Sequence, residues 1–160
     1  MEIHPETPLE GTLMTSRFRA EDIEAMMGHL RTMGAPFGIA FVDRPFLSNS
    51  RAALLAAEFA REQGKFQAFH EAAFTAYFSH GLDIGDGEVL RQIASDIGLD
   101  ADAMAGAVKS GKHLPMLEKA KEDAVRLGVT GVPTFFIDGK KLVGAQPLDV
   151  FRKALQSLKG

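Results

Sequence analysis

The chain has 160 residues, no cysteine and a formal net charge of −3, and apolar residues make up 46% of it. This size allows one domain with a hydrophobic core, and the lack of cysteine excludes a disulfide, a thiolate nucleophile and a thiolate metal site within these residues. The acidic balance argues against nucleic-acid binding, and no apolar run reaches the roughly 18–20 residues of a membrane span. The acidic, proline-rich start carries no secretory signal pattern, so we expect a soluble cytoplasmic protein that contacts neither nucleic acid nor membrane.

The first two thirds of the chain are predicted to be mainly helical. Residues 1–15 are extended or loop, and residues 35–47 are mostly loop because they contain two prolines. Apolar residues recur at helical spacing in the segments between and after these loops. The predicted helices cover residues 19–33, 50–64, 65–81, 87–98, 101–111 and 115–127. Ser48 or Asn49, Asp86 and Asp100 are candidate N-caps of three of them.

The pattern then changes to that of a hairpin. Residues 133–137 and 141–144 are predicted strands, and Asp138-Gly139 between them is a strong hairpin turn signal. A last amphipathic helix is expected over 147–158. The strand PTFFI is apolar on both faces, which is typical of a strand inside a sheet that is covered on two sides. Further strands are therefore expected, with residues 2–4 and 37–42 as candidates.

Three stretches resemble the DsbA-like family, in the cytoplasmic branch typified by FrnE-like oxidoreductases. They are MEIHPETPLEG at the start, the long segment from SRAALLAAEF to DIGLD, and GVTGVPTFFIDGKKLVGAQ near the end. The resemblance implies an α/β thioredoxin-like fold, truncated at its N-terminus, with a large helical insertion. Residues 1–160 would then form a single domain, with the insertion mainly over 19–127 and a C-terminal ββα half over 128–160.

The same resemblance implies a substrate-binding loop of Gly131, Val132, Pro133 and Thr134. In such a loop the Val132–Pro133 peptide bond is cis, and the backbone of Val132 pairs with an extended peptide or protein substrate. The residues alone leave a second interpretation open, in which Pro133 simply begins an edge strand.

The chain departs from the family in one important respect, because the Cys-x-x-Cys motif is absent. Thiol–disulfide exchange needs a thiolate, so we expect a DsbA-family protein that is redox-inactive in this chain, with no catalytic residue and no cofactor. A misassigned start or a natural truncation would account for the absence. The alternatives are a non-catalytic peptide-binding module and a relative of 2-hydroxychromene-2-carboxylate isomerase, which works with glutathione and a serine.

The residues give weaker support for a metal site, a calcium-binding loop or a serine hydrolase. The five histidines are not spaced three or four residues apart on one helix, so no metal site is expected; they are His4, His29, His70, His80 and His113. The acidic DIGDGE segment fails the EF-hand spacing. Ser48, Ser50 and Thr130 lack a recognisable base partner, which argues against a serine hydrolase.

The expected absence of part of the sheet predicts a partner. An uncovered sheet edge tends to pair with another strand, and an uncovered apolar face tends to bind another surface. We therefore expect a homodimer, formed by strand pairing or by a swap of residues 1–10.

Overall fold

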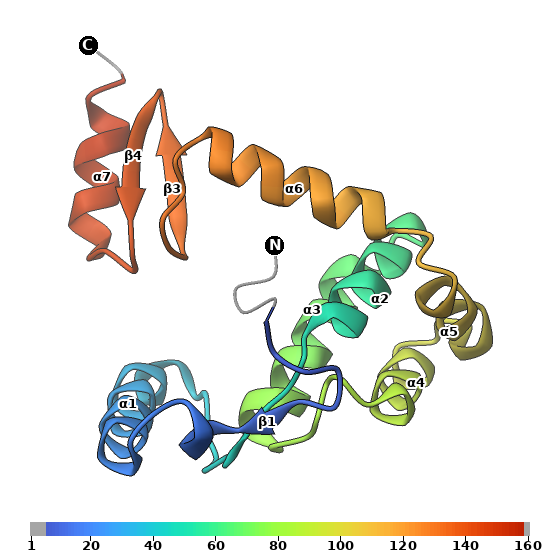
Figure 1. The fold of residues 1–160 in the computed structure, drawn as a ribbon. Helices are drawn as coiled ribbons and strands as arrows, with labels where there is room; N and C mark the ends of the chain where they lie inside the picture. Colours follow the sequence, from blue (N-terminus) through green and yellow to red (C-terminus); the bar gives the residue numbers. More distant parts are fainter. Residues whose placement is uncertain (1–5, 159–160) are drawn as a thin grey trace. The chain divides into compact units, whose positions relative to one another are not determined.

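The computed structural model describes residues 6–158, and helices dominate this part of the chain (Figure 1). The α-helices are α1 Ala20–Gly34, α2 Arg51–Glu62, α3 Phe66–Phe74, α4 Gly87–Asp96, α5 Ala101–Lys109, α6 Leu114–Arg126 and α7 Leu148–Gln156. The strands are β1 Thr12–Leu13, β2 Phe46–Leu47, β3 Thr134–Ile137 and β4 Lys140–Val143. None of the described helices is long and apolar enough to cross a membrane.

The chain divides into two compact units. The helical unit extends to Glu118, and the C-terminal unit begins at Lys119. Helix α6 contains this boundary, so it contributes residues to both units. Each unit has its own architecture and is described in turn.

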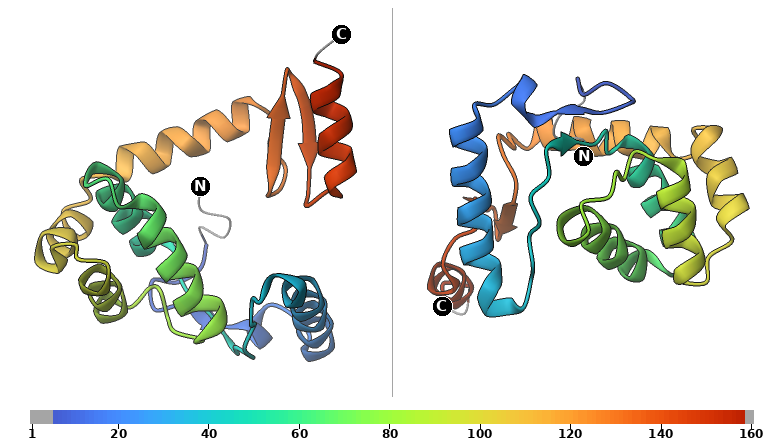
Figure 2. Two further views of the ribbon diagram at one scale, coloured as in Figure 1. Left: turned by 180° about the vertical axis from the view of Figure 1, so that it is seen from behind. Right: turned by 90° about the horizontal axis from the view of Figure 1, so that it is seen from below.

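The core of the helical unit lies among α2, α3, α4 and α5, which Figure 2 shows gathered together. Phe69 of α3, Leu90 of α4 and Met104 of α5 are each at most 2% exposed. Small residues on α2, including Ala56 and Ala60, are fully buried and let the neighbouring helices approach closely. Burial of one large apolar side chain contributes about 1.5–3 kcal/mol, so this core is the main source of stability in the unit.

The predicted helices are confirmed to within a few residues, and two of the three caps are confirmed. The Asp86 carboxylate accepts from the Glu88 amide, and that of Asp100 accepts from the Ala103 amide, at 2.8 and 2.9 Å. At α2 the cap residue is Ser50 and makes no side-chain bond, although the preceding Asn49 accepts from the Arg51 amide. The predicted helix over 65–81 continues past α3 as one π-helical segment, Thr75–Ser79.

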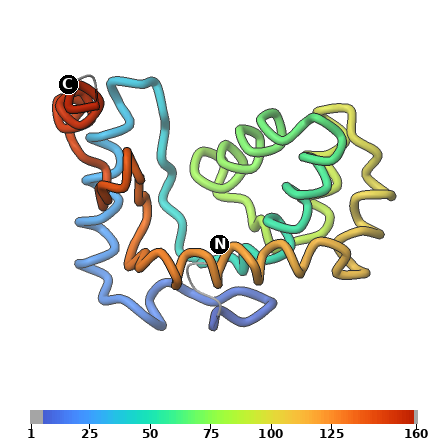
Figure 3. Tube along the Cα trace, turned by 90° about the horizontal axis from the view of Figure 1, so that it is seen from above, coloured from blue at the N-terminus to red at the C-terminus, as the bar shows by residue number. Residues whose placement is uncertain are grey.

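The prediction of a strand over residues 37–42 is wrong. Pro36 lies in a short 3-10 helix, Ala35–Phe37, and Gly38 follows in the left-handed region at φ 69°. The chain then returns alongside α1 without regular hydrogen bonding (Figure 3). Arg31 of α1 holds this stretch by donating to the Phe41 carbonyl at 3.3 Å. The candidate strand at residues 2–4 lies outside the described residues.

A short strand pair that the sequence did not indicate joins the two loops of the helical unit. Strand β1 pairs antiparallel with β2, with Thr12 opposite Leu47 and Leu13 opposite Phe46. Two-residue strands carry almost no periodic signal, which is why residues 1–15 were predicted only as extended or loop and residues 35–47 as mostly loop.

The C-terminal unit consists of the β3–β4 hairpin and α7 (Figure 1). Asp138 and Gly139 have φ angles of 47° and 75°, the left-handed values that a type I′ turn requires. The predicted turn is confirmed, and the strands begin within one residue of the prediction. Strand β3 was expected inside a wider, covered sheet, but among residues 6–158 it pairs only with β4. Phe135 and Phe136 are therefore 40% and 45% exposed rather than buried.

Candidate functional site

The four residues predicted to bind substrate form one continuous loop between α6 and β3. The Val132–Pro133 peptide bond is cis. The Thr134 hydroxyl donates to the Gly131 carbonyl at 2.6 Å and so ties the two ends of the loop together. Val132 is 57% exposed, and Pro133 is exposed as well. The loop is thus closed by its own residues and open to solvent on its outer side.

The hydrogen-bond pattern of β3 leaves one of its edges free. The Gly144 amide donates to the Pro133 carbonyl at 2.7 Å, which makes these two residues a hydrogen-bonded pair of the antiparallel ladder. Because such pairs alternate along a strand, the backbone groups of Thr134 and Phe136 point away from β4. Among the described residues these groups have no backbone partner. Two alternate residues of β3 therefore present unpaired N–H and C=O groups along its free edge, and Val132 precedes them in the adjoining loop.

The two faces of the hairpin differ in what covers them. The Phe135 ring packs edge-to-face on Phe151 of α7, with ring centroids 4.9 Å apart. Side chains alternate across a strand, so Phe136 belongs to the opposite face, together with Lys141, which lies across the register from it, and Val143, which lies across from Thr134. Phe136 and Val143 are the two large apolar side chains of this face. They are 45% and 41% exposed. The free edge of β3 thus borders an apolar face that α7 does not cover.

The loop contains no group suited to acid–base or nucleophilic chemistry. The Thr134 hydroxyl already donates within the loop. The nearest lysine along β4, Lys141, donates to the Gly128 carbonyl at 2.6 Å and so anchors the segment that follows α6. No group of three or more His, Asp or Glu side chains among the described residues could hold a metal ion. The arrangement can bind a strand, and it offers no catalytic constellation.

In the helical unit, Arg44 is a half-buried charge that the sequence analysis missed. Its guanidinium lies 3.2 Å from the centroid of the Tyr77 ring, in a cation–π arrangement. Burial lowers the pKa of Arg44 to about 10, and the nearby Asp83 carboxylate opposes that change. The side chain therefore stays charged at neutral pH. The separation of 33 residues between arginine and tyrosine leaves no local pattern that could have revealed this contact.

His113 is the most deeply buried polar side chain of the helical unit. It is 2% exposed, and its Nε2 has no hydrogen-bond partner among the described residues. The Glu62 Oε2 lies 3.8 Å from this nitrogen. Lys112 donates to the same carboxylate at 2.7 Å, and this bond is the main reason that the pKa of Glu62 lies below its usual value. The three side chains join the end of α2 to the start of α6, which is a structural role.

The sequence matches known proteins over nearly its full length. A profile of the family described as DSBA-like thioredoxin domain matches residues 1–156. A 2-hydroxychromene-2-carboxylate isomerase from Sphingobium xenophagum is 37% identical over 100 residues, 62% of this chain and 51% of that protein. The uncharacterized protein YwbO of Bacillus subtilis is 32% identical over 98 residues, 61% of this chain and 49% of that protein. The chain thus spans about half the length of the curated relatives that it matches.

Solved structures give the same fold. A probable DsbA oxidoreductase from Streptomyces coelicolor superposes with a TM-score of 0.88 and 24% identity, covering 100% of this chain and 73% of that one. A 2-hydroxychromene-2-carboxylate isomerase superposes with a TM-score of 0.74 and 19% identity, covering 86% of this chain and 67% of that one. At these identities the likeness concerns the fold, an α/β thioredoxin-like DsbA fold with a helical insertion, as predicted.

Proposed function

Because the chain belongs to the DSBA-like thioredoxin domain family, we propose that it binds extended segments of other proteins along the loop and free edge formed by residues 131–136. We propose further that these 160 residues perform no thiol–disulfide exchange themselves. One observation carries the proposal: Thr134 and Phe136 direct unpaired backbone groups along the free edge of β3, next to the exposed loop.

The spacing of those groups fits a peptide strand. An added strand pairs with alternate residues of a sheet edge, and its main-chain hydrogen bonds provide affinity without requiring a particular sequence. On the face that α7 does not cover, side chains of the bound segment would lie beside Phe136, which is 45% exposed. Apolar residues at alternate positions of the segment would pack against its ring from the side, because burial of apolar surface is favourable.

Backbone N-methylation of the peptide tests the proposed pairing. A dye-labelled peptide with alternating Val and Thr residues is titrated against the full chain, and binding is followed by fluorescence anisotropy. Methylation of the amides that face β3 is expected to weaken binding by about 2- to 10-fold per site, as each backbone hydrogen bond contributes about 0.5–1.5 kcal/mol. Methylation of the alternate amides serves as the matched control. Equal effects of the two methylation patterns would contradict edge pairing.

A pair of protein variants tests the face beside the edge. Phe136→Lys places a charge on the uncovered face and is expected to weaken peptide binding at least tenfold. Val125→Lys changes a residue of α6 that is 72% exposed and outside the hairpin, so binding should not change. If both variants bind the peptide as the original chain does, the apolar face takes no part in recognition.

The proposed lack of redox activity follows from the absence of cysteine. Disulfide exchange proceeds by attack of a thiolate on a disulfide sulfur, and this chain has no such nucleophile. We expect no turnover in an insulin reduction assay with dithiothreitol above the rate of dithiothreitol alone. Turnover that rises with the concentration of the chain would refute this part of the proposal.

A second copy of the chain is a competing occupant of the same edge. Unpaired edges tend to pair with each other, so we propose a homodimer when no peptide is present, with β3 opposite β3 of the partner. Light scattering coupled to gel filtration should give twice the mass of 17.3 kDa, and peptide should return the chain to a monomer. A monomer at all concentrations would exclude the dimer and leave the peptide proposal intact.

An isomerase is the second candidate function, and the 37% identity to a 2-hydroxychromene-2-carboxylate isomerase favours it. Calorimetric titration with glutathione and a spectrophotometric assay with 2-hydroxychromene-2-carboxylate separate the two candidates. The peptide-binding proposal expects neither binding nor conversion. Conversion that depends on glutathione would establish the isomerase in its place.

A further inference from the structure

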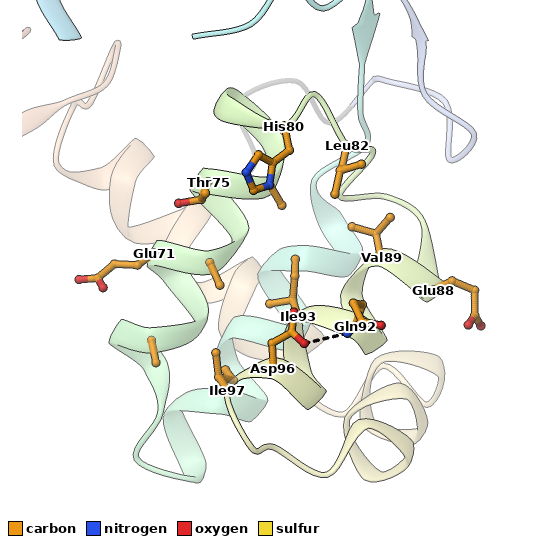
Figure 4. A pocket seen from close by; sticks show the side chains of 13 residues that line it. Glu71, Thr75, His80, Leu82, Glu88, Val89, Gln92, Ile93, Asp96 and Ile97 are labelled. Carbon is orange, nitrogen blue, oxygen red and sulfur yellow. Dashed lines mark hydrogen bonds between the residues drawn. The ribbon is translucent and has the colours of Figure 1, made fainter. Parts of the chain in front are cut away.

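A groove with a cavity volume of about 700 Å³ lies between α3 and α4 in the helical unit (Figure 4). Its floor is formed by two rows of apolar side chains. Within each row the residues are four positions apart, so each row follows one face of its helix. The rows are Ala68, Ala72 and Ala76 on the α3 side and Val89, Ile93 and Ile97 on the α4 side.

The groove is open because the side chains on its α3 side are short. Alanine ends at Cβ, so these residues do not fill the space in front of the longer side chains of α4. The large residues of the same two helices, Phe69 and Leu90, are buried in the core at 1% and 2% exposure and do not line the groove. Leu82 at one end is 43% exposed. Ala76 and Ile93 of the floor are buried at 5% and 6% exposure and belong to the core. Ala68 is exposed, and Ala72, Val89 and Ile97 are only partly buried, so the groove presents apolar surface at the border of the core.

Carboxylates stand on both sides of this floor. Glu71 belongs to the α3 side, and Glu88 and Asp96 belong to the α4 side (Figure 4). None of the described residues that line the groove is Lys or Arg, and His80 at one end is its one basic side chain. A ligand with apolar groups in the middle and positive charges at its flanks would match this distribution.

The groups around the groove leave most of that negative charge uncompensated. Glu71 and Asp96 accept hydrogen bonds from the neutral amides of Gln67 and Gln92, each at 2.7 Å. Arg91 is 3.9 Å from Glu88, but its closer partner is Asp102. At the end of α4, the Lys65 ammonium donates to the Ile97 and Gly98 carbonyls. These two backbone acceptors already hold the Lys65 side chain.

We propose that this groove binds a basic amphipathic helix of a partner protein. Two parallel rows of apolar residues with i, i+4 spacing accept a third helix, whose apolar face lies in the groove. Nine residues from Ala68 to Ala76 span about 12 Å at 1.5 Å per residue, so about two turns of the bound helix would be in contact. Lys or Arg residues on both sides of its apolar face would meet Glu71 on one side and Asp96 on the other, which favours one orientation.

The probe for this proposal is a synthetic helical peptide with leucines at i, i+3, i+4 and i+7 and lysines on both flanks. A matched peptide has the lysines replaced by glutamates, and a scrambled peptide keeps the composition without the amphipathic pattern. Titration of the full chain by fluorescence anisotropy should show binding of the lysine peptide, with both controls at least tenfold weaker. NMR shifts should centre on α3 and α4. Equal binding of the lysine and glutamate peptides, or shifts confined to the β3–β4 hairpin, would overturn the proposal.

Charge reversal in the groove gives the second test. Glu71→Lys and Asp96→Lys are each expected to weaken the lysine peptide about tenfold and to strengthen the glutamate peptide. Glu122→Lys, an exposed position of α6 outside the groove, makes the same change in net charge and should have at most a small effect. Far-UV circular dichroism and thermal unfolding confirm that each variant is folded. If Glu122→Lys weakens binding as much as Glu71→Lys, the attraction is due to net charge and the groove is not the site.

A third test separates a helix from a small amphiphile, because a short alkyl ammonium ion shares the same chemistry. Dodecylammonium is added to the isotopically labelled chain below its micelle concentration. If it shifts the resonances of Ala72 and Ile93 while the lysine peptide does not, the groove is a small-molecule site and the helix proposal is wrong. We expect the reverse: the lysine peptide binds in the groove, and dodecylammonium binds at least tenfold more weakly.

Discussion

The helical unit buries its apolar residues far more completely than the C-terminal unit does. In the helical unit Phe69 is 1% exposed, and aromatic and aliphatic side chains from four helices surround it. In the C-terminal unit none of the described residues from 119 to 158 is buried, and Phe136 is 45% exposed. Both units are rich in apolar residues, so composition does not explain the contrast.

The two units differ in burial because different numbers of helices and strands pack together in them. Four helices enclose a core, whereas a two-stranded sheet and one helix can cover only one face of the hairpin. A two-stranded hairpin is marginally stable in water, and units of about 40 residues usually need an additional source of stability. The helical unit therefore supplies most of the stability, and the C-terminal unit keeps the apolar and unpaired surface on which the proposed peptide binding rests.

The sharpest test of this contrast compares one core phenylalanine with one exposed phenylalanine. Phe69→Ala should lower the free energy of unfolding by about 3–5 kcal/mol, the usual cost of removing a buried aromatic ring. Phe136→Ala should cost about 0.5 kcal/mol or less, as for other surface substitutions. Urea denaturation followed by far-UV circular dichroism measures both. Similar losses from the two variants would mean that the units share one core.

Loss of a helix cap in the helical unit should lower the free energy of unfolding by less than loss of the core residue Phe69. Asp100 accepts from the Ala103 amide at the start of α5, whereas α7 in the C-terminal unit begins without a side-chain cap. Asp100→Ala should lower the free energy of unfolding by about 1 kcal/mol, and Asp100→Asn should restore most of it because asparagine also caps. Ser95→Ala, an exposed substitution on α4, is the control. Equal losses in Asp100→Ala and Asp100→Asn would show that the carboxylate acts through its charge instead.

The smallest expected effect is a loss of stability at acidic pH that arises from protonation of Glu62. The Lys112 hydrogen bond lowers the pKa of Glu62 in the folded chain, so its contribution to stability is present above the ordinary pKa and is lost as the pH falls through the lowered one. Glu62→Gln should reduce the fall in the melting temperature between neutral and acidic pH. The pair is exposed, so roughly 1 M salt should remove most of the difference between the two chains. An unchanged pH profile would assign the acid dependence to other carboxylates.

The sequence was most informative where structure depends on neighbours along the chain. The helices, the caps at Asp86 and Asp100 and the turn at Asp138-Gly139 rest on residues a few positions apart, and all were predicted. The loop of Gly131–Thr134 was found from the resemblance to the DsbA-like family, and its role in binding stays a prediction. The strand over 37–42 failed because Pro36 and Gly38 favour a tight turn over extended pairing, a preference that its apolar residues concealed.

By itself, the sequence determined the local structure, the family and the absence of any thiol in these 160 residues, because each of these depends on residue type and short-range spacing. The tertiary structure alone decided which apolar residues are buried and which are left exposed. Phe69 and Phe136 have the same side chain, and only the packing of distant segments distinguishes them. The same holds for the Arg44–Tyr77 contact, the β1–β2 pair and the groove between α3 and α4, which all join residues that no local pattern connects.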